Sequence, residues 1–358
     1  MNTKPLVAPP DVDDGTRATP EKPWLLRLLA SNATWVAILD IILILLFGAL
    51  SPGNVFLSVE NLQNQLLNGS QALLLALAMA TLLGAGLFDL SLGANLVVSS
   101  VIGAKVIMWT GGATVSAAGL NEFSRPGLGI ALGAIACLLA GLLFGLINGL
   151  LIAYLNINSL IATLGTLSVG SGLALIMTNG SDIGGLPPQI QSTFGLAKLF
   201  GFLPLPAVVA LVAAAAIGLM FRYTEFGTNT LAIGSSRLAG ERAGLAVRLH
   251  MLKLAGIAGL LAGTAGFISL SQYAATTTQG HTNDALAAVT AAVIGGTSLA
   301  GGRVSILGTI WGTALAGILL GGLVTIGVLP FYQLVAIGSV LIVAVAIDQF
   351  RQKGQARA

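Results

Sequence analysis

Two acidic residues at the edges of apolar runs are the strongest candidates for chemistry in this sequence. Asp89 lies in residues 86–93, which read GLFDLSLG, and Asp284 opens a later apolar run. A carboxylate in or beside a membrane segment is costly to desolvate and commonly marks a solute or ion path. Asp89 has two compatible interpretations, because its carboxylate can cap the following helix or stand at a helix break that faces a solute.

Uncharged polar residues in the same apolar runs extend this set. Such side chains usually bond within their own helix or let helices approach closely. As a set they suit a neutral, hydroxyl-rich solute better than an ion, because ion coupling commonly uses more intramembrane carboxylates. The residues expected along a translocation path are Asp89, Ser91, Asn95, Asn148, Thr163, Thr166 and Asp284. A further acid, Asp40, is expected to form a helix–helix hydrogen bond or a snorkelling contact.

The composition shows what must position these residues. Of 358 residues, 55% are hydrophobic and 8% are charged, against about 25% charged in a soluble domain. A soluble globule of this size needs more polar surface than this chain can supply. The sequence therefore predicts an all-α polytopic membrane protein, whose 47 glycines favour closely packed helices.

Several classes of chemistry are excluded by what the sequence lacks. One cysteine rules out a disulfide scaffold, and two histidines argue against a His-rich metal site. There is no G-x-x-x-x-G-K-[ST] loop, no H-E-x-x-H pair and no G-x-S-x-G elbow. We therefore expect no enzymatic activity, no catalytic residue, and no cofactor or metal bound by this chain.

Ten segments approach the length and apolarity of membrane spans. A helix needs about 20 apolar residues to cross a bilayer, and several segments are short enough to be broken or re-entrant. The predicted spans are Thr34–Leu50, Gln71–Gly86, Leu90–Trp109, Leu128–Leu155, Ser159–Met177, Leu205–Phe221, Met251–Ala274, Leu286–Leu299, Ile306–Ile326 and Tyr332–Ile347.

The basic residues predict the orientation of these spans. Four precede the first span, five lie in residues 222–253 and three follow the last span, together 12 of the 16 basic residues. The positive-inside rule places all three zones in the cytoplasm. Six and then four spans separate the zones, which gives an N-in, C-in topology. Because topology accounts for the positive charge, no nucleic-acid partner is expected.

The predicted spans and basic zones also set the expected domain boundaries. Residues 1–33 are expected to be a disordered cytoplasmic tail, and residues 351–358 a cytoplasmic C-terminal tail. Residues 34–350 form the transmembrane domain, with a cytoplasmic loop at 222–250. Asp89 and Asp284 open the third and eighth spans, and a repeat of five spans must invert topology. Their similar contexts, DLSLGA and DALAAV, are consistent with a five-span inverted repeat.

Several short motifs, taken in order, resemble those of one transporter family. They are G-x-x-D-L-S-x-G at 86–93, G-x-x-N-G-x-x-I at 145–152, ATLGT at 162–166, AIG at 232–234, and a Gly-rich stretch at 294–302 followed by SILGT at 305–309. From about residue 57 to 349, the chain resembles the permease subunits of bacterial ABC importers for monosaccharides, which include the ribose, xylose, arabinose and autoinducer-2 permeases. It departs from them at Ala285 and Ala287, where relatives carry an acidic pair, and this departure bears on the solute.

The resemblance implies partners as well as a fold. Two permease copies, identical or paralogous, would form the pore in the bacterial inner membrane, surrounded by lipid. Two ATPase subunits would bind and hydrolyse ATP beneath them, and a periplasmic binding protein would deliver the solute from above. Residues 234–245 would carry a short coupling helix that docks on the ATPase, with Ala243 and Leu245 among its apolar contacts. The residues that the resemblance assigns to this loop are Gly234, Ser235, Ser236, Arg237, Leu238, Ala239, Glu241, Arg242 and Gly244.

Other functions stay open on the sequence alone. A permease of a branched-chain amino-acid or nucleoside importer would look similar. An ion-coupled secondary transporter would need embedded acids, for which Asp40 and Asp89 give thin support. A passive channel or scaffold would not need the loop at 234–245.

Overall fold

The computed structural model describes residues 32–116, 121–329, 331–333, 335–336 and 338–339. Within these residues, eight helices are long and apolar enough to cross a membrane, which confirms an all-α polytopic membrane protein. They are α2 (Asn32–Leu50), α3 (Val59–Gly84), α4 (Leu92–Thr110), α5 (Pro126–Ala153), α6 (Ser159–Thr178), α7 (Leu205–Tyr223), α10 (Val247–Tyr273) and α12 (Ile306–Thr325). The expected tails, except for Asn32 and Ala33, and most of the tenth predicted span lie outside the described residues.

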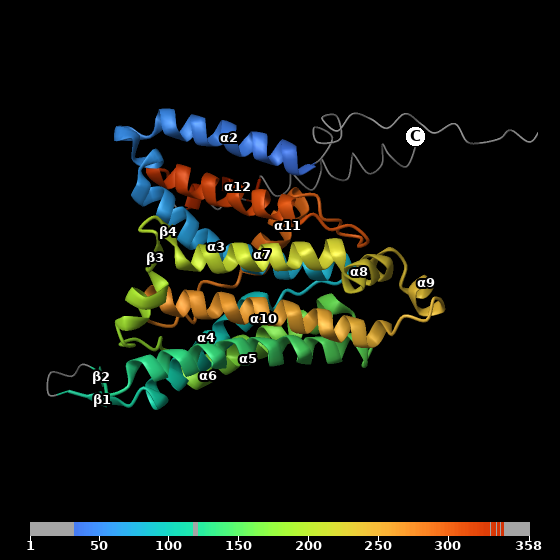
Figure 1. The fold of residues 1–358 in the computed structure, drawn as a ribbon, viewed down its shortest axis with the longest axis horizontal. Helices are drawn as coiled ribbons and strands as arrows, with labels where there is room; N and C mark the ends of the chain where they lie inside the picture. The colour runs from blue at the N-terminus through green and yellow to red at the C-terminus, as the bar shows by residue number, and fades with distance from the viewer. Residues whose placement is uncertain (1–31, 117–120, 330, 334, 337, 340–358) are drawn as a thin grey trace, which may run out of the picture.

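The two ends of the bundle differ in structure (Figure 1). One end carries the short turn η1 (Pro52–Leu57), the segment η2 (Gln191–Gly195) and two antiparallel hairpins. The hairpins are β1 (Ala113–Val115) with β2 (Asn121–Phe123), and β3 (Lys198–Leu199) with β4 (Leu203–Pro204). At the other end, α8 (Glu225–Ser235) and α9 (Arg237–Arg242) project past the spans (Figure 1). We call these the hairpin end and the α9 end. Helix α2 begins at the α9 end (Figure 1), as the parity of the predicted spans requires.

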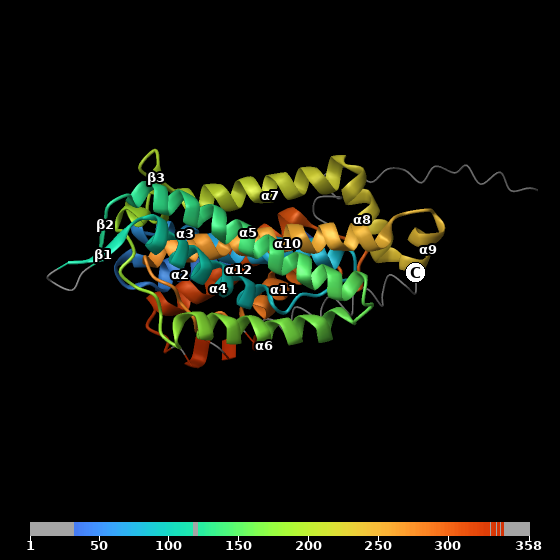
Figure 2. The ribbon, with the colours of Figure 1, turned by 90° about the horizontal axis from the view of Figure 1, so that it is seen from below.

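The spans divide into a central and a peripheral group. Most side chains of α3, α4 and α10 are buried, whereas α2, α5, α6 and α7 keep one face exposed. On α5 the exposed face presents Leu139, Leu143, Ile147 and Leu150, which are spaced about one turn apart. An exposed apolar face of this kind is what lipid contact requires. Figure 2 shows α7 and α6 on opposite flanks of the bundle.

A glycine seam sets the close packing of α5 against α10. Gly141 and Gly145 lie one turn apart on α5, and Gly259 and Gly263 do the same on α10. A Cβ atom added at Gly145 would lie 2.3 Å from a backbone carbonyl oxygen of α10. Glycine therefore lets the two backbones touch, in the small-xxx-small manner of membrane helices.

The eighth predicted span, Leu286–Leu299, is not a full span. The helix found there, α11 (Asp284–Ile294), has 11 residues, a length of about 17 Å at 1.5 Å per residue. The hydrocarbon core of a bilayer is about 30 Å thick, so α11 crosses about half of it. Residues 274–283, which are not helical, lead from the end of α10 to its start. The apolar run predicted as the eighth span is therefore a half-length helix that begins after a non-helical segment.

Helix α4 also starts at a break, which is formed by residues 85–91. The starts of α4 and α11 meet, since a Cβ atom at Gly93 would lie 2.1 Å from the carbonyl oxygen of His281. Helix α4 runs to the hairpin end, whereas α11 leads to a turn that contacts α8 at the α9 end. The two helices thus run in opposite directions, as an inverted repeat requires.

The second span begins at Val59 rather than at Gln71. Ser58 caps this helix by accepting the backbone N–H of Asn61 at 3.2 Å, and Glu60 lies in its first turn, where a negative charge is favourable. The amide-rich residues 61–71 are therefore helical and not a loop. The polar residues of this first part of α3 lower its hydropathy, so the apolar run by itself did not predict it as part of the span.

Candidate functional site

The carboxylate of Asp89 lies inside a buried hydrogen-bond network. Its Oδ1 accepts the backbone N–H of Ser91 at 2.8 Å and the Ser91 hydroxyl at 2.5 Å. Asn148 on α5 donates through Nδ2 to Asp89 Oδ2 at 3.1 Å and to Ser91 Oγ at 2.8 Å. All three residues are at most 4% exposed. The carboxylate thus holds the turn before α4 and ties it to α5, which is close to the helix-capping interpretation.

The same break is fastened to α6. Thr163 accepts the backbone N–H of Leu90 at 3.1 Å, and Ser159 accepts that of Phe88 at 3.3 Å. Backbone donors in a helix break need such partners, since lipid offers none. Thr163 is fully buried and serves the backbone in this structure.

The other two uncharged candidates also bond within the helix bundle. Asn95 donates from Nδ2 to the carbonyl of Gly141 at 3.2 Å, and its Oδ1 accepts the hydroxyl of Ser99. Thr166 bonds to the carbonyl of Thr163, in its own helix. None of the residues Asp89, Ser91, Asn95, Asn148, Thr163 and Thr166 lines the groove described next. Asp284 does.

A groove of about 560 Å³ lies between α3, α11 and α12; most of its wall is apolar, and a row of amides runs along its α3 side. Its polar side chains are Asn61, Asn64, Gln65, Asn68 and Gln71 from α3, Tyr273 at the end of α10, His281, Asp284 and Thr313. Small residues such as Ala287, Ala291 and Gly317 form much of the facing wall. Among the described residues that line the groove there is no lysine or arginine. We call this cavity the amide groove.

The start of α11 carries a hydrogen-bonded series of side chains. The hydroxyl of Thr277 lies 2.9 Å from His281 Nε2, and His281 Nδ1 lies 2.7 Å from Asp284 Oδ2. Asp284, the one acidic side chain among the described lining residues, is thus hydrogen-bonded to His281. Asp284 Oδ1 has no hydrogen-bond partner among the described residues and is free to accept from a solute.

Sequence reasoning missed the amides of α3. Asn61, Asn64, Gln65 and Asn68 recur at spacings of three and four, which places them on one helix face. This period was visible in the sequence. It was overlooked because the predicted span began only at Gln71.

Asp40 differs from its expected role. Its side chain is 1% exposed, so it does not snorkel to an interface. Neither of its carboxylate oxygens has a hydrogen-bond partner among the described residues. The expected helix–helix hydrogen bond is therefore absent from the described part of the chain.

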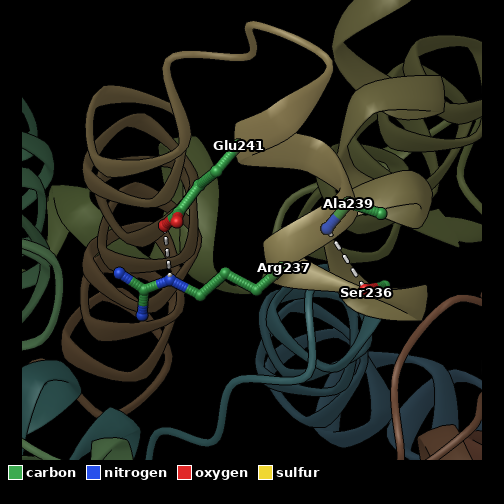
Figure 3. Close-up of polar contacts among 4 residues, drawn as sticks. All are labelled: Ser236, Arg237, Ala239 and Glu241. Atoms are coloured by element: carbon green, nitrogen blue, oxygen red, sulfur yellow. Dashed lines mark hydrogen bonds and ion pairs between the residues drawn. The ribbon is translucent and has the colours of Figure 1, made fainter.

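The α9 end presents a short, well-formed helix (Figure 3). Ser236 Oγ accepts the backbone N–H of Ala239 at 3.2 Å, and Arg237 pairs with Glu241 at 3.3 Å. Gly244, with φ of 81°, ends the helix in the left-handed conformation that favours glycine. The structure therefore contains the brief helix expected in this loop.

Most of the residues expected to form the coupling surface are exposed. They are Ser235, Ser236, Arg237, Leu238, Ala239, Glu241, Arg242 and Gly244. Leu245 is different, because it packs against the main apolar core. It belongs to the anchor of α9 and not to the exposed face.

Helix α8 connects this exposed face to the bundle. His250 on α10 lies 2.7 Å from the hydroxyl of Thr230 and stacks on the ring of Phe226. A Cβ atom at Gly234 would lie 2.0 Å from the carbonyl oxygen of Gly84 and 2.6 Å from the nitrogen of Gly302. The end of α8 thus touches the end of α3 and the turn between α11 and α12.

Comparison with known proteins places this arrangement in a family. Residues 61–345 match the family model described as branched-chain amino acid transport system / permease component. This chain belongs to that family of permease components. The matched range includes both broken helices, the amide groove and the α8–α9 pair. No solved structure gives a match to the chain.

Curated relatives of this permease resemble it over most of its length. The ribose import permease of Bacillus subtilis is 36% identical over 310 residues, which are 86% of this chain and 90% of the relative. The galactose/methyl galactoside import permease of Haemophilus influenzae is 32% identical over 330 residues, 90% of this chain and 95% of the relative. The D-allose transport system permease of Escherichia coli is 29% identical over 339 residues, 94% of this chain and 98% of the relative.

Proposed function

We propose that this chain is the permease subunit of an ATP-driven importer for a sugar or a sugar-like solute. The observation that carries the proposal is the similarity to permeases named for galactose, ribose and allose, which extends over most of each chain. The ATPase would be a separate subunit, and a periplasmic binding protein would deliver the solute. Two permease copies would form the pore in the bacterial inner membrane.

The amide groove supports a neutral solute over the branched-chain amino acids that the family description mentions. A zwitterion needs partners for both its ammonium and its carboxylate. Among the described lining residues there is no lysine or arginine to meet the carboxylate, and Asp284 already bonds to His281. Neutral amides, by contrast, both donate to and accept from hydroxyl groups.

Helix α9 would dock on the ATPase. Leu238 is 57% exposed at the α9 end, and in the sequence it lies between the exposed pair Arg237 and Glu241. An apolar side chain with a charged rim is typical of a protein contact. The helix is also anchored, because Gly240 and Leu245 pack beneath it.

Movement of α9 would reach the break before α4 and the turn after α11 through α8. Gly234 contacts Gly84, which directly precedes the break at residues 85–91, and it contacts Gly302 in the turn that follows α11. Gly302 also donates its backbone N–H to the carbonyl of Gly84 at 3.1 Å. A displacement of α8 would thus shift α4 and α11 together, as a rigid-body switch between two states requires.

Reconstitution tests this function. The chain would be placed in proteoliposomes with an ATPase subunit and a binding protein from the same organism, and uptake of labelled galactose, ribose, allose and leucine would be measured. We expect accumulation of at least one sugar that needs ATP and both partners. Accumulation by the permease alone, or of leucine and no sugar, would refute the proposal.

A further inference from the structure

Several polar groups in and beside the amide groove lack partners. The side chains of Asn64, Gln65, Gln71 and Tyr273 form no hydrogen bond with other described residues. Gln272, which does not itself line the groove, donates from Nε2 to Asn68 Oδ1 at 2.8 Å, and its own buried Oε1 accepts from no described residue. An unmet buried acceptor costs free energy unless a ligand or water supplies a donor.

We propose that the amide groove is a recognition site for a neutral, polyhydroxylated solute within the permease itself. This inference rests on the proposed import function and adds to it, because the permease would then select its solute independently of a binding protein. Asn64 and Asn68 would bond to hydroxyl groups along the solute, and Asp284 Oδ1 would accept one more.

The geometry of the groove fits such a solute. Asn61, Asn64 and Asn68 follow one face of α3, and Asp284 faces them from the start of α11. The series Thr277–His281–Asp284 fixes the carboxylate through Oδ2 and leaves Oδ1 available. Small-molecule sites have volumes of about 300–1,000 Å³, and this groove has about 560 Å³.

Other occupants leave the groove chemistry unsatisfied. An acyl chain would offer no partner to Asn64, Asn68 or Gln71, and polar groups without partners are costly in hydrocarbon. An anionic or zwitterionic solute would meet no lysine or arginine among the described lining residues. A hydroxyl-rich ring meets both requirements, because each hydroxyl both donates and accepts.

Direct binding to the purified permease tests the proposal. The full chain would be reconstituted in lipid nanodiscs without ATPase or binding protein, and saturation-transfer NMR would be recorded with D-galactose, D-ribose, D-allose and L-leucine. The double variant Asn64→Ala/Asn68→Ala removes two amides from the groove. Gln189→Ala, at an exposed amide in the loop that follows α6, is the matched control.

We expect the wild-type chain to bind at least one of the three sugars. The double variant should lose about tenfold in affinity, because two hydrogen-bonding amides are removed from the groove. Gln189→Ala should bind normally, and all three proteins should melt at similar temperatures.

Three results would overturn the inference. The first is a sugar affinity in the double variant equal to that of the wild-type chain. The second is binding of leucine in competition with sugar. The third is absence of sugar binding, which is expected if lipid or a second copy of the chain fills the groove. If the assembled importer still takes up sugar in an ATP-dependent way, any of these results would contradict the groove proposal but not the proposed import function. Absence of sugar uptake would defeat that function instead.

Discussion

The contact of Gly234 with Gly84 and Gly302 makes a sharp prediction about coupling. In Gly234→Ala the new Cβ would lie 2.0 Å from one backbone atom and 2.6 Å from another. Ordinary packing does not allow contacts below about 3 Å, so the end of α8 must move by about 1 Å. Overpacking of this kind costs about 1–3 kcal/mol.

Two measurements on the reconstituted importer would report this effect. Because the contact links α9 to the break before α4 and to the turn that follows α11, ATP hydrolysis should continue while sugar uptake falls at least severalfold. The melting temperature of the purified chain should fall by a few degrees. A destabilisation of 1 kcal/mol lowers it by about 2–4 °C in a chain of 150–250 residues and by less in a longer chain such as this one.

A matched glycine variant separates coupling from a general effect of alanine. Gly172 on α6 has nothing within 4 Å of its Cβ position, so Gly172→Ala should change neither uptake nor melting. Normal uptake and normal melting in Gly234→Ala would refute the reasoning. A parallel loss of ATP hydrolysis and uptake would place the defect in assembly rather than in transmission.

Three further substitutions test other parts of the structure. Arg237→Glu should abolish ATP-coupled uptake with little change in the melting temperature, because an exposed ion pair is worth only about 0.3–0.5 kcal/mol. The swapped variant Arg237→Glu/Glu241→Arg restores the ion pair. If it also restores uptake, the single variant had lost helix stability and not docking. Asp40→Leu should raise the melting temperature, because the buried Asp40 carboxylate has no partner among the described residues and such a group costs about 1–3 kcal/mol or more. A lower melting temperature would show that Asp40 has a partner elsewhere in the chain. Gly145→Ala should destabilise the chain by about 1–3 kcal/mol, because its Cβ would lie 2.3 Å from a carbonyl oxygen of α10. The control Gly165→Ala has nothing within 4 Å of its Cβ and should melt like the wild-type chain. Equal melting temperatures in the two variants would contradict the glycine seam.

Much of the fold could be predicted from apolar runs. The span expected at Ser159–Met177 is the helix Ser159–Thr178, and Leu205–Phe221 is Leu205–Tyr223. Prediction works here because a chain in lipid must satisfy its backbone hydrogen bonds internally, which makes a long apolar run a helix. It failed at residues 61–71 and at α11, because a hydropathy average misses a polar helix face and cannot tell a half span from a whole one.

Only one of the residues that line the amide groove was predicted from the sequence as a site residue. Asp284 was expected near a solute, and it lines the amide groove. Asp89 has a similar sequence context, yet it lies among Ser91, Asn148 and the start of α4. Local sequence could not distinguish the two acids, because their difference depends on which helix packs against each break.

The sequence by itself determined the membrane character, most of the long helices and the short helix α9, whose cap Ser236 and terminating Gly244 are local features. The tertiary structure decided which polar residues face another helix and which face a groove. Both arrangements satisfy the same physical demand, since a polar group in a membrane protein needs a partner, and a neighbouring helix and a solute can each supply one. Only the packing of helices far apart in the chain selects between them.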